Sequence, residues 1–129
     1  MRFMMLMIPA VTEENWVPTD ARAVAAMTKF NQEMIDAGVM LTGDGLQPPS
    51  KGARVSFGGG APKVTDGPFA EAREVVGGYW MIQAKSKAEA VEWARRCPAA
   101  AGDTIEIRQV FEMSDFPEDV QKAAAANQK

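Results

Sequence analysis

Residues 2–8 read RFMMLMI and are apolar on both alternating faces of a strand, which constrains the fold more than any other part of the chain. Met4, Leu6 and Ile8 fall on one face, whereas Phe3, Met5 and Met7 fall on the other. A strand of this kind is covered on both faces. In a chain of 129 residues, helices can cover one side, and the other side needs a second sheet or a partner subunit. We therefore predict a homodimer that forms through the sheet faces, because a large exposed apolar face is uncommon on a soluble monomer.

The first half of the chain predicts a helix, a second strand and a hairpin. A helix is expected over residues 20–37, because Thr19 or Asp20 can cap its start and Gly38 suits the position after its end. A second strand begins at residue 39 and leaves through a turn at 43–49. Residues 54–57 and 62–65 are expected to form an outlying β-hairpin around the three glycines at 58–60.

The second half of the chain predicts a strand, a helix and a last strand. Residues 79–84 are the clearest strand, and the capping box that begins at Ser86 starts a helix that runs to about Cys97. Residues 104–112 give the last strand. With right-handed crossovers, this order predicts an α+β, ferredoxin-like fold, in which a four-stranded antiparallel sheet carries two helices on one face and the outlying hairpin. We expect one domain over residues 1–113 and a C-terminal tail over 114–129.

Composition excludes several classes of function. The net charge of −3 and pI of about 5.0 leave no basic footprint for nucleic acid. No run approaches the length of a membrane span, and the apolar start is too short for a signal peptide. The single cysteine, Cys97, excludes an internal disulfide and fits a cytoplasmic location, and we expect it to be a small core residue rather than a nucleophile. The chain has no histidine, so it lacks imidazole bases and imidazole metal ligands; we expect no cofactor and no metal.

The run from Asp66 to Phe69, DGPF, combines strong backbone constraints. Gly67 can take a positive φ and precedes a proline, while Pro68 fixes its own φ and has no N–H to donate. Asp66 can accept hydrogen bonds from nearby backbone N–H groups, and Phe69 places a large ring just after the corner. Both a plain tight turn and a rigid pocket wall fit this pattern, and residue spacing favours the turn.

The longer run TDGPFAEAREVVGGYWMI, residues 65–82, resembles the signature of the DGPF proteins, a branch of the YCII-related family. Weaker agreement extends over residues 1–111. The resemblance implies a ferredoxin-like domain that pairs as a dimeric α+β barrel, with an activity that is mostly unassigned in the family. It also implies a functional link to an extracytoplasmic-function sigma factor. Some relatives use a histidine–aspartate pair, which this chain cannot form, and relatives often have a proline where this chain has Gln109.

The polar candidates for a functional site are Arg54, Asp66, Glu71, Arg73, Glu74, Tyr79, Glu106 and Arg108. Asp66 is the residue that we carry over from the DGPF motif. We expect it to face a cleft that is lined by Phe69 and by Tyr79 or Trp80, with Arg54 or Arg108 nearby to hold an anionic group. Burial of Asp66 would raise its pKa and suit acid–base chemistry, whereas backbone hydrogen bonds would lower the pKa and make the residue structural. Glu106 and Arg108 are more typical of a surface pair.

Two functions remain open. The first is a small-molecule-binding or accessory module without catalysis. The second is a cofactor-free enzyme that uses Asp66 as acid and base on a small apolar organic substrate. The absence of histidine favours the binding module slightly.

Overall fold

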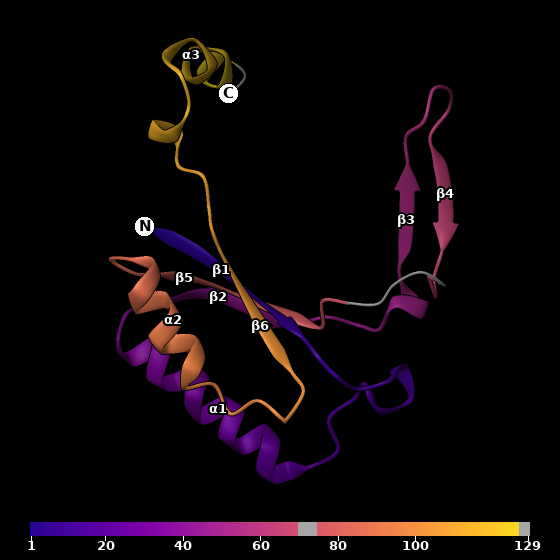
Figure 1. Cartoon of the computed structure of the whole chain (residues 1–129), viewed down its shortest axis with the longest axis vertical. Coiled ribbons are helices and arrows are strands. Elements are labelled where there is room, and N and C mark those ends of the chain that lie inside the picture. Colours follow the sequence, from indigo (N-terminus) through magenta and orange to yellow (C-terminus); the bar gives the residue numbers. More distant parts are fainter. Residues whose placement is uncertain (70–74, 127–129) are drawn as a thin grey trace.

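The computed structural model describes residues 1–69 and 75–126, and its centre is a four-stranded sheet with the strand order β2-β5-β1-β6 (Figure 1). Every neighbouring pair of strands in this sheet is antiparallel. The strands are β1 (Arg2–Ile8), β2 (Met40–Gly45), β5 (Gly78–Gln83) and β6 (Thr104–Gln109). The predicted α+β, ferredoxin-like architecture is confirmed, and the doubly apolar strand β1 lies inside the sheet, where strands flank it on both sides.

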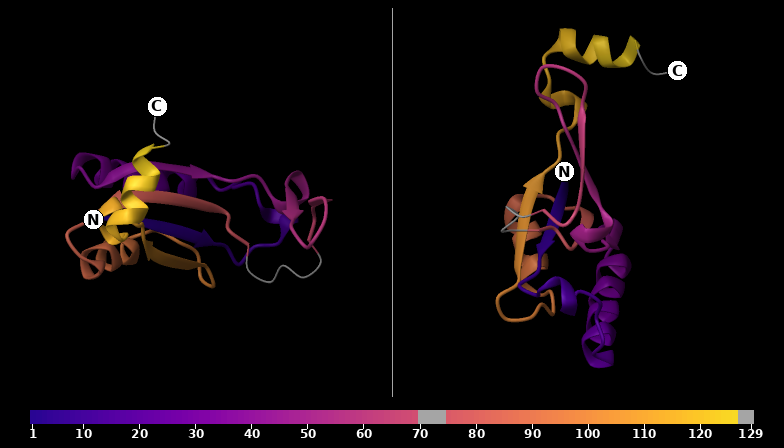
Figure 2. Two further views of the ribbon diagram at one scale, coloured as in Figure 1. Left: turned by 90° about the horizontal axis from the view of Figure 1, so that it is seen from above. Right: turned by 90° about the vertical axis from the view of Figure 1, so that its right-hand side faces the viewer.

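Two helices, α1 (Ala21–Asp36) and α2 (Lys87–Arg95), cover one face of the sheet (Figures 1 and 2). The Asp20 side chain accepts a hydrogen bond from the Arg22 N–H and caps α1, and Gly38 follows the helix with φ of 71°. Ser86 caps α2 by accepting from the Glu89 N–H. The predicted capping residues of both helices are thus confirmed. No helix of the described residues is long and apolar enough to cross a membrane.

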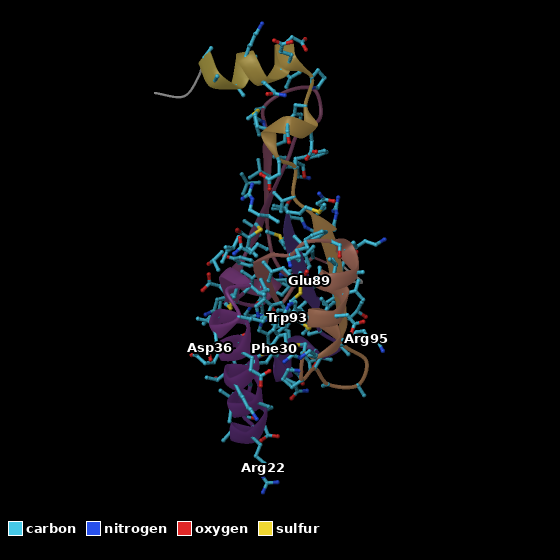
Figure 3. The ribbon with its side chains drawn as sticks, turned by 90° about the vertical axis from the view of Figure 1, so that its left-hand side faces the viewer. Arg22, Phe30, Asp36, Glu89, Trp93 and Arg95 are labelled. Carbon is cyan, nitrogen blue, oxygen red and sulfur yellow. The ribbon has the colours of Figure 1, made fainter. Side chains whose placement is uncertain are left out.

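The core lies between the two helices and the sheet. Its buried side chains are Phe3, Met5, Phe30, Met34, Val39, Trp80, Ile82, Ala84 and Ala90. Phe30 meets the Trp80 ring edge to face, with ring centroids 6.2 Å apart. Figure 3 shows Phe30 and Trp93 among the side chains between the helices, whereas Arg22 extends away from the body. Along α1, Phe30 and Met34 are buried, whereas Ala23, near the start of the helix, is exposed.

Strand β2 continues further than the sequence predicted. The turn was expected from residue 43, yet Gly43 pairs with Trp80 and Gly45 pairs with Gly78 in the sheet. A Cβ atom on Gly43 would lie 3.0 Å from the Tyr79 carbonyl oxygen and 3.1 Å from the Trp80 ring. The glycine therefore allows a neighbouring strand and a bulky ring to approach closely, and it does not end the strand here.

Two segments extend beyond this body. The predicted hairpin is present as β3 (Ala53–Ser56) and β4 (Lys63–Asp66), which form a separate two-stranded sheet. After β6 the chain passes through a short 3-10 turn, η3 (Met113–Asp115), into α3 (Glu118–Ala126). Strand β6 ends at Gln109, before the predicted residue 112. The Val110 N–H still donates to the Arg2 carbonyl oxygen, and beyond that bond only Met1 of the partner segment remains.

The face of the sheet opposite the helices is not covered by any helix of the described residues (Figure 1). The register places Met4 beside Met81 and Leu6 beside Tyr79, and all four of these side chains are half-buried. We call this surface the open sheet face. It carries the second apolar row of β1, for which the sequence predicted a partner subunit.

Candidate functional site

The DGPF corner lies against a short 3-10 turn, η2 (Pro49–Lys51), which precedes the hairpin. The Gly67 N–H donates to the Gly52 carbonyl oxygen at 3.0 Å. A Cβ atom on Gly67 would lie 1.8 Å from the Pro49 carbonyl oxygen, so no other residue fits without a backbone shift. The φ of Gly67 is not positive, and the Gly67–Pro68 peptide bond is cis. Close backbone approach, rather than the positive φ considered above, accounts for the glycine of the motif.

The loop after β1 fixes the η2 turn from the other side. Its 3-10 turn, η1 (Glu13–Asn15), places Glu13 so that its carboxylate accepts the Ser50 N–H at 2.7 Å. The hydrogen bonds from Ser50 lower the pKa of the Glu13 carboxyl, because they stabilise its charged form. The Trp16 indole N–H donates to the Leu46 carbonyl oxygen at 2.8 Å. Two long-range contacts thus fasten this loop to the segment between β2 and the hairpin.

A cleft of about 480 Å³ opens between the η2 turn, the start of the hairpin and the DGPF corner. Its lining is Leu46, Gln47, Pro48, Pro49, Lys51, Gly52, Arg54, Phe69, Val75 and Val76. A second hollow, of about 310 Å³, shares Pro49, Phe69 and Val75 with the first and therefore adjoins it. We call the larger hollow the Phe69 cleft. Most of this lining is apolar, and among the described residues its charged side chains are two cations, Lys51 and Arg54.

The Arg54 guanidinium lies over the Phe69 ring, with 3.9 Å from Cζ to the ring centroid. This distance is well within the range of cation–π attraction, which orients the guanidinium without using its N–H donors. A planar guanidinium can hold a carboxylate or phosphate through two parallel hydrogen bonds. Neither Arg54 nor Lys51 takes part in a salt bridge among the described residues. The cleft therefore offers an anion site beside an apolar wall.

The structure brings together only part of the predicted site. Arg54 and Phe69 line one cleft, as expected, but Asp66 is exposed at the end of β4 and does not belong to the lining. The expected burial of Asp66 by Phe69 and Trp80 is not present. Glu71, Arg73 and Glu74 lie outside the described residues.

The other predicted residues lie on the large sheet. Tyr79 and Trp80 are neighbours in β5, so their side chains point to opposite faces. Trp80 is buried under the helices, and its indole N–H donates to Asn31 at 2.9 Å. Tyr79 lies on the open sheet face, where its hydroxyl donates to the Asp44 carboxylate at 3.1 Å and this contact raises the pKa of Tyr79. Arg108 is on the same face, opposite Met4 in the register, and it is exposed. Its neighbour Glu106 is exposed there too.

Sequence reasoning missed the residues that build the walls of the cleft. Glu13 and Trp16, which hold those walls through Ser50 and Leu46, were not among the candidates, and neither were Pro49 and Lys51. A tryptophan between two prolines in a loop was an available signal, because so large a ring is seldom left in water. The Glu13 contact spans 37 positions and no local pattern predicts it.

The lone thiol has no role in this cleft. Cys97 is half-buried and packs against the core, as predicted. Burial raises the pKa of its thiol to about 11, with a smaller contribution from Asp103. At neutral pH the group is therefore protonated and a poor nucleophile. Among residues 1–69 and 75–126, no group of three or more potential ligands is arranged to hold a metal ion.

Comparison with known protein families gives a match over most of the chain. A family model described as the YCII-related domain matches residues 1–114. No curated protein sequence matches the chain.

Proposed function

The chain belongs to the YCII-related domain family, and from this premise we propose that it binds a small organic anion in the Phe69 cleft, as a binding or accessory module. The observation that carries the proposal is the Arg54 guanidinium held over the Phe69 ring. The ring sets the plane of the cation, so less conformational freedom is lost when an anion binds. Lys51 adds a second positive charge on the same cleft.

The size and the lining of the cleft also indicate the size and polarity of the rest of the ligand. Its volume of about 480 Å³ falls within the range of small-molecule sites. Leu46, Pro48, Val75 and Val76 supply apolar surface next to the cations. A carboxylic acid with a flat or branched apolar body satisfies both parts: its carboxylate pairs with Arg54 and its body packs against this wall. Strongly hydrated anions without an apolar body are expected to bind more weakly.

A thermal-shift screen with aromatic and aliphatic carboxylic acids tests the proposal. A ligand that is present at about 100 times its Kd adds about 2.7 kcal/mol to the free energy of unfolding, which is a measurable shift in Tm. The substitution Arg54→Gln should weaken the best ligand about 10- to 100-fold, because a charged hydrogen bond contributes about 1.5–3 kcal/mol. Arg22→Gln, an exposed change on α1, is the matched control and should leave Kd unchanged. Equal binding by both variants would contradict the assignment.

We also propose that the protein is a homodimer that buries the open sheet face. The half-buried side chains of Met4, Leu6 and Met81 on this face support the proposal, since a second copy would remove them from water. Sedimentation equilibrium at micromolar concentration is the test, and a monomer mass would contradict it.

Three further proposals rest on the sequence. The resemblance to DGPF proteins supports a functional link to an extracytoplasmic-function sigma factor. The single cysteine supports a cytoplasmic location. The alternative function, a cofactor-free enzyme that uses Asp66, is tested by Asp66→Asn: a loss of turnover with unchanged stability would favour it, and ligand binding that depends on Arg54 alone would not.

A further inference from the structure

The hairpin of β3 and β4 has an apolar surface that residues 1–69 and 75–126 leave exposed. Val55 pairs directly with Val64, so the two side chains lie on the same face. Val55 is 51% exposed and Val64 is 64% exposed. Phe57, at the start of the tip, is 80% exposed. Within the part of the chain that the structure describes, the two strands pair only with each other, and an isolated two-stranded hairpin is marginally stable in water. The hairpin therefore needs a partner surface.

The C-terminal arm, residues 110–126, also has exposed apolar side chains. Phe111 is 71% exposed, and Met113 and Val120 are also exposed. The arm is anchored at its root, where the Glu112 carboxylate accepts from the Arg2 guanidinium at 2.9 Å. Beyond that root, α3 extends away from the sheet (Figure 1). A firm root and an exposed apolar end are typical of a segment that packs on another molecule.

The two segments leave the sheet at diagonally opposite corners. Strands β2 and β6 are the two edges, and the antiparallel pairing makes them run in opposite directions. The hairpin follows β2 and the arm follows β6, so they emerge at opposite ends as well as opposite edges. The left view of Figure 2 shows them at opposite ends, and Figure 1 shows both extending away from α1 and α2. Both segments thus flank the open sheet face.

A second copy laid on the open sheet face can meet these segments in two ways. A two-fold axis that runs along the diagonal places hairpin on hairpin and arm on arm. A two-fold axis across the diagonal places each hairpin on the partner's arm. Charge distinguishes the two. Residues 51–66 carry Lys51, Arg54 and Lys63 against one carboxylate, Asp66. The arm carries Glu112, Asp115, Glu118 and Asp119 against one cation, Lys122.

We propose that the apolar face of the hairpin docks on the C-terminal arm of a second copy of this chain, so that each protomer holds the other at two places. Like segments would set like charges together, whereas hairpin on arm pairs a basic segment with an acidic one. The contact covers Val55, Phe57 and Val64 with the apolar side chains of the arm. It rests on the proposed homodimer and adds to it the orientation of the two copies.

Cross-linking between copies tests the arrangement. In a Cys97→Ala background, one chain carries Val64→Cys and another carries Val120→Cys. The mixed sample, treated with a short bismaleimide, should give the 64–120 product as the main cross-link. Main products that join 64 to 64 or 120 to 120 would overturn the proposal. A dimer mass without any cross-link would overturn it too and would leave the sheet-face dimer standing, while a monomer mass would overturn both. Ligand binding in the Phe69 cleft is measured separately and does not enter this result.

Charge reversal provides a second measurement. The pair Glu118→Lys and Asp119→Lys should raise the dimer Kd about tenfold, because it sets like charges together, and Lys63→Glu should act in the same direction. In a mixture of the two variant chains, one contact of the mixed dimer keeps its original charges, and the other sets the reversed residue 63 against the reversed residues 118 and 119, so the mixture should restore the affinity. Lys29→Glu, on the exposed side of α1, is the control for a change of charge alone. Variants that weaken the dimer without rescue in the mixture would overturn the proposed pairing.

Discussion

Replacing Gly67 by alanine should open the corner that forms the Phe69 cleft. The new Cβ atom would lie 1.8 Å from the Pro49 carbonyl oxygen, and even a contact of 3.0 Å requires a shift of about 1.2 Å. Both backbones are held: the Gly67 N–H bonds to Gly52, and the Ser50 N–H bonds to the Glu13 carboxylate. The shift must therefore stretch or break at least one of these bonds.

The expected cost follows from those contacts. A neutral hydrogen bond, such as that from Gly67 to Gly52, contributes about 1 kcal/mol, and overpacking of a tight site costs about 1–3 kcal/mol. We expect the free energy of opening the corner to fall by about 2–4 kcal/mol. The loss is local, because the core between the helices and the sheet does not contact Gly67, so Tm should change less than this value implies.

Hydrogen exchange at the Gly67 and Ser50 amides is the appropriate assay, together with Kd for the best carboxylate ligand. Exchange at both amides should be faster and binding weaker. Gly58→Ala is the matched control, since a Cβ atom there meets nothing within 4 Å and its φ is not positive. If Gly67→Ala protects both amides and binds ligand as well as Gly58→Ala does, the account of the corner is refuted.

Three further predictions concern titration and reactivity. Because the pKa of Glu13 is lowered, its contact with Ser50 stabilises the loop at pH values above the carboxyl pKa of the unfolded chain, and this stabilisation is lost as pH falls through the folded pKa. The Ser50 amide should therefore exchange faster in acid, and Glu13→Gln should remove that pH dependence. Tyr79 is the only tyrosine, so an absorbance titration should show phenolate forming above the usual pKa of about 10, and Asp44→Asn should shift the midpoint downward. A normal midpoint would contradict the Tyr79–Asp44 contact. Cys97 should react slowly with a thiol reagent at neutral pH and faster only near pH 11 or after unfolding.

The fold was largely predictable because its signals are local. The doubly apolar β1, the cap at Asp20 and the capping box at Ser86 each depend on residues close together in the chain, and the structure confirms them. The predicted end of β2 was wrong because Gly43 was interpreted as a turn residue. Its role is to let the Trp80 ring approach, and only the pairing of β2 with β5 reveals that contact.

The site was less predictable because its contacts connect distant segments. Arg54 and Phe69 could be placed together from the hairpin and the corner, and they do meet. Glu13 and Trp16 reach the cleft walls from a loop whose path no local rule predicts. Tyr79 and Trp80 could have been separated earlier, because strand alternation alone places adjacent residues on opposite faces.

The central claim is that the ligand binds at Arg54 in the Phe69 cleft, and mapping of amide chemical shifts by NMR during a titration with the best carboxylate tests it most directly. The account predicts saturable shifts at the amides of Leu46, Lys51, Arg54 and Val76. These shifts should disappear in the Arg54→Gln variant and remain in the Arg108→Gln variant. Shifts that gather instead at Leu6, Tyr79 and Arg108 would place the site on the open sheet face and contradict the account.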